Sequence, residues 1–241
     1  MDRISRRQQR ESRKLRLRRR LLVHHLPLLA ASAGAVTWIY VTRPYSDVVM
    51  RASFATAYPA LILLLVTLAI GPLNILLRRR NPVSIDLRRD VGIWAGILAA
   101  AHTAIGQNVH LRGRPWLYYV YQHPLRHLLP IRHDVFGVAN YSGALCTLVV
   151  LMLLVTSNDY SLRRLGTGSW KKLQRWNYAA FGLLAIHALG YEEGIERQKF
   201  LFVAITVGGL VVTAVLQLAG FAARRSVALA KAPVLENGSG P

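Results

Sequence analysis

The feature that most constrains this chain is a series of apolar runs, each close to the length that crosses a lipid bilayer. A membrane-spanning helix needs about 20 predominantly apolar residues. Six such runs are present, at residues 26–41, 52–77, 90–110, 135–155, 173–190 and 200–223. Because helices satisfy their own backbone hydrogen bonds in lipid, the runs predict an all-α integral membrane protein built as a six-helix bundle. The expected parts are a basic tail (1–20), the bundle (21–225) and a short tail (226–241).

The distribution of charge orients this bundle. The chain has 31 Lys and Arg against 11 Asp and Glu. The cations gather in alternate segments, at 1–20, 78–89, 163–175 and 224–225. Since Lys and Arg concentrate on the cytoplasmic side, both termini are expected in the cytoplasm. The basic tail is also expected to meet anionic lipid head groups. The cations do not lie on one soluble face, which argues against nucleic acid as a partner.

Two histidines lie inside apolar runs and point to function. His102 is in the third run and His187 in the fifth. An ionisable side chain in hydrocarbon is costly and usually faces a partner, a cofactor or water. At 1.5 Å per residue, His102 lies about 18 Å from Asp90, and His187 about 21 Å from Leu173. The two are therefore expected at similar depth in the outer half of the membrane, as the two axial ligands of one haem would be. A metal ion, a proton relay or hydrogen-bonded packing also fits this spacing.

Segments around these histidines carry a family resemblance. The stretch TSNDYSLRRLGTGSWKKLQRWNYAAFGLLAIH and the stretch LRRDVGIWAGILAAAH resemble the ferric reductase-like transmembrane superfamily, which includes NADPH oxidases, STEAP metalloreductases and MsrQ haem subunits. The matching residues are Thr156, Ser157, Leu165, Gly166, Trp170, Leu173, Arg175 and His187, with His102 ending the second stretch. The resemblance covers residues 50–220. It implies six helices, b-type haem and electron transfer across a membrane, here a bacterial inner membrane.

The chain departs from this family at the inner haem site. Members with two haems have a second histidine on each of these helices, at the positions held here by Arg89 and Gln174. Neither residue is an expected haem ligand. One haem b per chain is therefore expected. The residues after the last run are too few for a flavin or nicotinamide domain. The expected protein is an electron-transfer subunit that needs a cytoplasmic reductase or quinol as donor, and an acceptor outside.

Other residues complete the expected sites. Arg112 and Arg114 are placed to pair with haem propionates. Arg89, Gln174 and Trp176 are predicted to border an inner pocket for FMN, FAD or a quinone, because arginine binds phosphate and aromatic rings stack. His110, His123, His127 and His133 are expected outside the membrane as interfacial residues, with a metal site as the alternative. Two other functions remain open, namely a histidine-lined transporter or proton pathway without haem, and a non-redox membrane scaffold.

Overall fold

The computed structural model describes residues 3–78, 83–195 and 200–230. Within these ranges the chain is all-helical, as predicted, apart from its loops and an isolated bridge between Val120 and Ile131. The α-helices are α1 (Arg3–Arg20), α2 (Leu26–Thr42), α3 (Val48–Leu76), α4 (Val83–Gly106), α5 (Val135–Thr156), α6 (Asp159–Gln174), α7 (Asn177–Leu189) and α8 (Phe200–Ala230). Short π-helical segments, η1 (Leu21–His25) and η5 (Gly190–Ile195), precede α2 and follow α7.

Four helical segments are long and apolar enough to cross a membrane, which gives the chain the character of a multi-pass membrane protein. They are Lys14–Thr42, Val48–Leu76, Val135–Thr156 and Phe200–Ser226. Apolar side chains also face outward: Trp38 is 70% exposed, Val155 71% and Leu218 70%. Such surfaces suit lipid rather than water. Helices α4 and α7, which carry His102 and His187, are not among the four.

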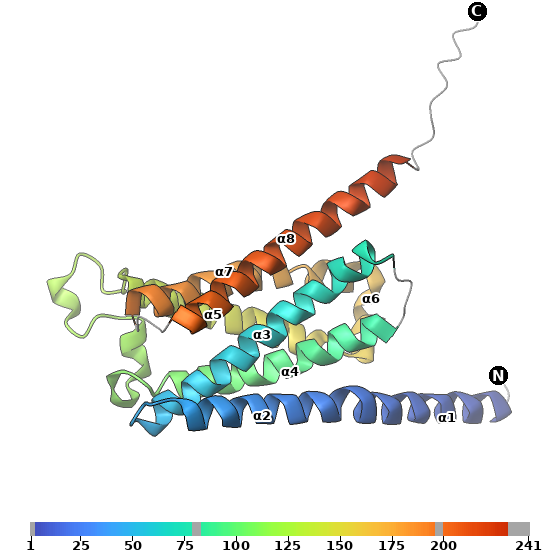
Figure 1. Ribbon diagram of the computed structural model, residues 1–241, viewed down its shortest axis with the longest axis horizontal. Coiled ribbons are helices and arrows are strands. Elements are labelled where there is room, and N and C mark those ends of the chain that lie inside the picture. Colours follow the sequence, from blue (N-terminus) through green and yellow to red (C-terminus); the bar gives the residue numbers. More distant parts are fainter. Residues whose placement is uncertain (1–2, 79–82, 196–199, 231–241) are drawn as a thin grey trace, which may run out of the picture.

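The centre of the bundle is packed through small residues. Ala55 of α3, Ala95 of α4 and Ala180 of α7 are each at most 1% exposed. Leu64, Cys146 and Val150 join Ala95 and Ala180 in one buried cluster. Small residues let helix backbones approach closely in membrane proteins. This brings α4 and α7 to opposite sides of a shared interior, with α3 and α5 beside them (Figure 1).

Helix α1 differs from its expected form. Residues 1–20 were predicted as a tail, but 3–20 form a helix that continues through η1 into α2 as one rod along the side of the bundle (Figure 1). Arg, Lys, Gln and Leu are all good helix formers, so the composition permits this. Residues 3–20 are almost entirely charged or polar, so no apolar face indicated a helix there, but nothing in the sequence excluded one.

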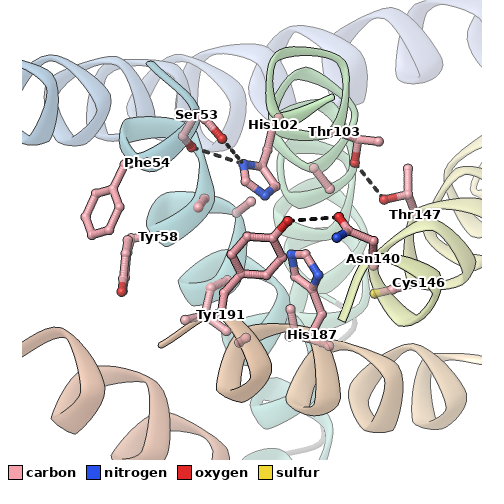
Figure 2. A pocket seen from close by; sticks show the side chains of 18 of the residues that line it. Ser53, Phe54, Tyr58, His102, Thr103, Asn140, Cys146, Thr147, His187 and Tyr191 are labelled. Carbon is pink, nitrogen blue, oxygen red and sulfur yellow. Dashed lines mark hydrogen bonds between the residues drawn. The ribbon is translucent and has the colours of Figure 1, made fainter. Parts of the chain in front are cut away.

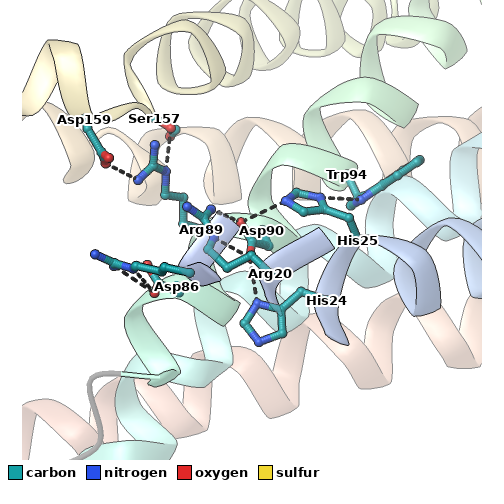
Figure 3. A network of polar contacts seen from close by, with 10 residues as sticks. Arg20, His24, His25, Asp86, Arg89, Asp90, Trp94, Ser157 and Asp159 are labelled. Atoms are coloured by element: carbon teal, nitrogen blue, oxygen red, sulfur yellow. Dashed lines mark hydrogen bonds and ion pairs between the residues drawn. The ribbon is translucent and has the colours of Figure 1, made fainter. Parts of the chain in front are cut away.

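The middle of the rod is tied to α4 by a polar network (Figure 3). Asp90 is fully buried and accepts hydrogen bonds from the guanidinium of Arg20 and from Nδ1 of His24, the latter at 2.7 Å. His25 places Nε2 3.4 Å from the same carboxylate, while its Nδ1 accepts a bond from Trp94 at 3.3 Å. One turn earlier, Arg16 pairs with Asp86 at 2.8 Å.

The fifth predicted run is shorter than expected. Its first residues, 173 and 174, belong to α6, and the chain turns at Arg175 and Trp176 before α7 begins. Within α6, Gly166 has φ 72°, a conformation that favours glycine and breaks the helix. Lys171, Lys172 and Gln174 make this segment polar, so it ends where the apolar sequence begins.

The loop between α4 and α5 contains the short turns η2 (Leu111–Gly113), η3 (Pro115–Tyr118) and η4 (Pro124–Arg126). These single turns are the helical structure of this loop. Its prolines lack the backbone N–H that a longer helix requires.

Candidate functional site

His102 projects from α4 toward α3. Its Nδ1 lies 3.0 Å from the backbone carbonyl oxygen of Ser53 and 3.4 Å from the Ser53 hydroxyl. A carbonyl oxygen can only accept, so Nδ1 carries the proton in this contact. The neutral ring then presents an unprotonated Nε2, which is the form that binds a metal.

His187 of α7 has the same kind of contact on the other side. Its Nδ1 donates to the carbonyl oxygen of Ala139, on α5, at 2.8 Å. Gly143 lies one turn further along α5, and a Cβ added there would come within 2.5 Å of the same Nδ1. Because a side chain at 143 would displace the imidazole, glycine is needed for His187 to reach its carbonyl partner.

The two imidazoles share one space. Their ring centres are 6.1 Å apart and their planes meet at 67°. Figure 2 shows both rings turned into the region between α4, α5 and α7. The predicted pairing of His102 and His187 is therefore present in the fold as a juxtaposition of side chains from two helices.

A cavity of about 170 Å³ surrounds the pair. Much of its wall is apolar or small, including Leu61, Leu64, Ala95, Ala99, Gly106 and Ala144. Thr103 and Thr147 join across it through a hydrogen bond of 2.7 Å between their hydroxyls. The cavity is thus mainly apolar, with a few polar groups at fixed places, as small-molecule sites usually are.

A buried carboxylate also lines the cavity. Glu192 of η5 is 5% exposed, and its Oε1 accepts bonds from the hydroxyls of Tyr58 at 2.7 Å and Thr206 at 2.6 Å. The guanidinium of Arg43 lies close by in the same region, 3.6 Å from the ring centre of Phe54 and 3.7 Å from that of Phe202. The sequence did not predict Glu192 as a site residue.

Tyr191 and His110 form the outer wall. The Tyr191 ring centre is 5.1 Å from that of His187, and its hydroxyl donates to Oδ1 of Asn140 at 2.9 Å. His110 stacks on Tyr191, with ring centres 6.2 Å apart. His110 was expected outside with the other loop histidines, but it lines the cavity. Helix α4 ends at Gly106, and the backbone that follows turns back because Tyr118 hydrogen-bonds both Gly106 and His110.

The other predicted site residues do not line this cavity. Arg114 is exposed and its Nε donates to the carbonyl of Leu111 at 3.3 Å. The side chain of Arg112 lies outside the described part of the structure. The structure therefore does not give either arginine a position beside the cavity from which it would pair with a haem propionate.

The three residues predicted to border the inner pocket have different surroundings. Arg89 donates to Asp159 at 2.7 Å and to the carbonyl of Ser157 at 2.7 Å (Figure 3). The hydrogen bond from Arg89 holds the pKa of the Asp159 carboxyl below its ordinary value, so this carboxylate is charged at neutral pH. Trp176 is 53% exposed, and Nε2 of Gln174 is buried without a hydrogen-bond partner among the described residues.

No known family model matches the chain, and no solved structure matches it. Within the described residues, no group of three or more His, Cys, Asp or Glu side chains is placed to hold a metal ion. A site with two histidine ligands falls below this threshold of three side chains. The geometry of His102 and His187 is therefore the observation that bears on function.

Proposed function

We propose that this chain is a membrane b-type cytochrome subunit that carries electrons through one haem held by His102 and His187. The observation that carries the proposal is the facing of two imidazoles across one cavity, with ring centres 6.1 Å apart. With metal–imidazole bonds of about 2 Å, two imidazoles on opposite sides of one ion have ring centres roughly 6 Å apart. His102 and His187 would hold the haem iron, and the separation of their ring centres supports this role.

The chain's own residues prepare both imidazoles for this role. The carbonyls of Ser53 and Ala139 each accept a hydrogen bond from Nδ1–H of one ring, which fixes the tautomer and places the ring's lone pair on Nε2. Small residues on α4 and α5 keep the space between the rings clear of long side chains. When bound, haem supplies one-electron chemistry at a potential set by its axial ligands and burial.

The cavity must widen to admit the whole group. A cavity of about 150 Å³ holds one benzene ring, and this one measures about 170 Å³. A porphyrin is several times larger. The Tyr191 ring packs beside His187, lines the cavity and belongs to η5 rather than to a long helix, so its movement would enlarge the cavity.

The six-span topology, with both termini inside, belongs to this proposal, because α4 and α7 must cross the membrane for the pair to lie within it. The donor would be a cytoplasmic reductase or quinol and the acceptor would lie outside. Since Arg89 is engaged by Asp159, a flavin phosphate would first have to break that ion pair. This favours a quinol over FMN or FAD as the small-molecule donor.

The test is a visible spectrum of the purified full chain before and after dithionite, with a pyridine haemochrome assay. We expect about one low-spin haem per chain. His102→Ala and His187→Ala should each abolish the low-spin spectrum. His127→Ala is the matched control, because His127 is exposed in the outer loop. Colourless protein, or bleaching by the control variant, would overturn the proposal.

A second candidate is a proton pathway without haem. It is favoured by one observation, the buried Glu192 and its two hydroxyl donors in the same cavity as the histidines. Proteoliposomes of colourless protein that conduct protons, and lose this conductance in Glu192→Gln, would support it over the cytochrome.

A further inference from the structure

Arg88 of α4 is a partly buried cation that the candidate site does not use. Its guanidinium packs against α3, where a Cβ added to Gly71 would lie 3.4 Å from Nη1. Burial is the largest influence on the charge of this side chain. The next residue, Arg89, pairs with Asp159 at 2.7 Å, but among the described residues no carboxylate pairs with Arg88. A cation shielded from water normally has an anionic partner.

A second cation lies beside the same turn of α3. Gly220 of α8 packs closely there, because a Cβ added to it would lie 2.9 Å from Cβ of Pro72, the residue after Gly71. Arg224 follows Gly220 by one helical turn and is on the same face of α8. It is close enough for its positive charge to act on Arg88, and the two charges repel. Figure 1 shows α8 running beside α3 and continuing beyond its end.

Helix α7 borders this region with a polar contact. The hydroxyl of Tyr178 donates to Oε1 of Gln217 at 3.4 Å, and Nε2 of Gln217 donates to the carbonyl oxygen of Leu68 at 2.8 Å. Gln217 and Arg224 are seven residues apart and share one face of α8. The Tyr178 hydroxyl is also close enough to act on Arg88. Side chains of α4, α7 and α8 therefore meet at one end of α3.

The surroundings of the two arginines resemble a lipid head-group region. Helix α8 is long and apolar enough to span a membrane over Phe200–Ser226, and Arg224 is in the last turn of that segment. Phe221, one turn before Arg224, is 67% exposed, and Tyr178 is 59% exposed. Aromatic rings are enriched where membrane meets water, and cations there attract anionic lipids. A ligand with both a phosphate and apolar chains matches these neighbours.

We propose that Arg88 and Arg224 form a binding site for a phosphate group, supplied by a phospholipid whose acyl chains lie along the exposed apolar side of α8. Arginine binds phosphate through paired, charge-assisted hydrogen bonds. A phosphate between the two guanidinium groups would offset their repulsion and the desolvation of Arg88. Neither arginine lines the histidine cavity, so this site does not depend on haem. A soluble phosphate ester has the same chemistry, and the experiment separates the two sources.

The experiment titrates the purified full chain, in neutral detergent, with dioleoylphosphatidylglycerol and measures bound lipid by native mass spectrometry. Dioleoylglycerol is the ligand control, because it has the same acyl chains and no phosphate. Arg88→Gln should weaken phosphatidylglycerol binding at least about tenfold, since it removes hydrogen bonds to a charged group. Arg224→Gln should weaken it at least about fivefold. Arg224 is exposed, so this second variant keeps the test decisive if Arg88→Gln does not fold.

Arg225→Gln is the matched control variant. It removes the same charge from the next residue of α8, which is exposed and points about 100° away around the helix. Its affinity should stay within about twofold of the unmodified chain. Equal losses in Arg224→Gln and Arg225→Gln, or equal binding of dioleoylglycerol, would overturn the proposal.

A competition arm identifies the source of the phosphate. Inorganic phosphate and FMN should not displace phosphatidylglycerol. Displacement by either would assign the site to a soluble phosphate and overturn the lipid assignment. Haem content should be equal in the unmodified chain and all three variants, so failure of this site is distinguishable from failure of the proposed function.

Discussion

At the scale of single residues, the backbone carbonyls decide what the two histidines can do. Each Nδ1–H is fixed by a carbonyl on a neighbouring helix, Ser53 on α3 and Ala139 on α5. A ring held in this way has one orientation and one tautomer. The site is therefore assembled by helix packing, and it is sensitive to the size of the residues that allow the packing.

Gly143→Ala tests this sensitivity. The new methyl group would lie 2.5 Å from Nδ1 of His187, so the imidazole must leave its carbonyl partner. We expect loss of the low-spin haem spectrum and a destabilisation of about 1–3 kcal/mol, typical of an overpacked interior. Gly182→Ala on α7 is the control, because a Cβ there meets nothing within 4 Å. An unchanged spectrum in Gly143→Ala would show that His187 does not need this position.

The sequence indicated the histidine pair but not its surroundings. His102 and His187 could be predicted because an ionisable group in an apolar run is costly and therefore rare. Glu192 and His110 lie at the ends of runs, where polar residues are ordinary, and only the turns of the backbone at η5 and after Gly106 bring them into the cavity. Gly143 gave no signal, since its role depends on a contact with another helix.

At the scale of elements, Asp90 connects the first span to the helix that carries His102. Its carboxylate is fully buried between Arg20, His24 and His25. Removing one member of a buried ion network leaves the others without compensation, which costs more than the pair itself contributes. The network is therefore the point at which the position of α4 is most vulnerable.

Asp90→Ala should lower stability by about 3–5 kcal/mol, because it leaves the buried guanidinium of Arg20 without its carboxylate partner. Asp86→Ala, in the neighbouring pair, should cost about 0–1 kcal/mol, since its partner Arg16 is 65% exposed. Thermal unfolding of both variants in the same detergent is the measurement. Equal effects would mean that the burial of Asp90 does not determine its contribution.

The ion pair between Arg89 and Asp159 connects α4 to α6 and should respond to acid. The hydrogen bond from Arg89 lowers the pKa of Asp159 from its ordinary 3.8. A lowered folded-state pKa stabilises the protein above the unfolded pKa, and this stabilisation is lost as pH falls through the folded value. At pH 7, Asp159→Asn should therefore unfold at a slightly lower temperature than the unmodified chain. The loss in free energy of unfolding should be only about 0–1 kcal/mol, because the pair is partly exposed. The difference should disappear as the pH is lowered below 3.8; a difference that persists in acid would show that it does not arise from this charge.

At the scale of the whole molecule, hydropathy gave the helical class and most of the spans, but not the segments governed by contacts. The runs at 26–41, 135–155 and 200–223 correspond closely to α2, α5 and α8. Helix α1 and the break before α7 could not be predicted from apolar length. The first depends on ion pairs with α4, and the second on a turn at Arg175 and Trp176 that places a polar helix before an apolar one.

Cysteine labelling can establish whether α7 crosses the membrane, on which the depth of His187 depends. Helix α7 has 13 residues, about 20 Å of helix, and needs η5 to approach the thickness of a bilayer. We expect Lys172→Cys and Arg225→Cys to react with an impermeant maleimide from one side of sealed vesicles, and Leu125→Cys from the other. Cys146 is 7% exposed and should not react, which provides the background. If Arg225→Cys reacts from the side of Leu125→Cys, an odd number of crossings separates it from Lys172. In that case α7 and α8 do not both span. Because α8 is long and apolar enough to cross a membrane, α7 would be the helix that does not cross, and the proposed intramembrane position of His187 would be wrong.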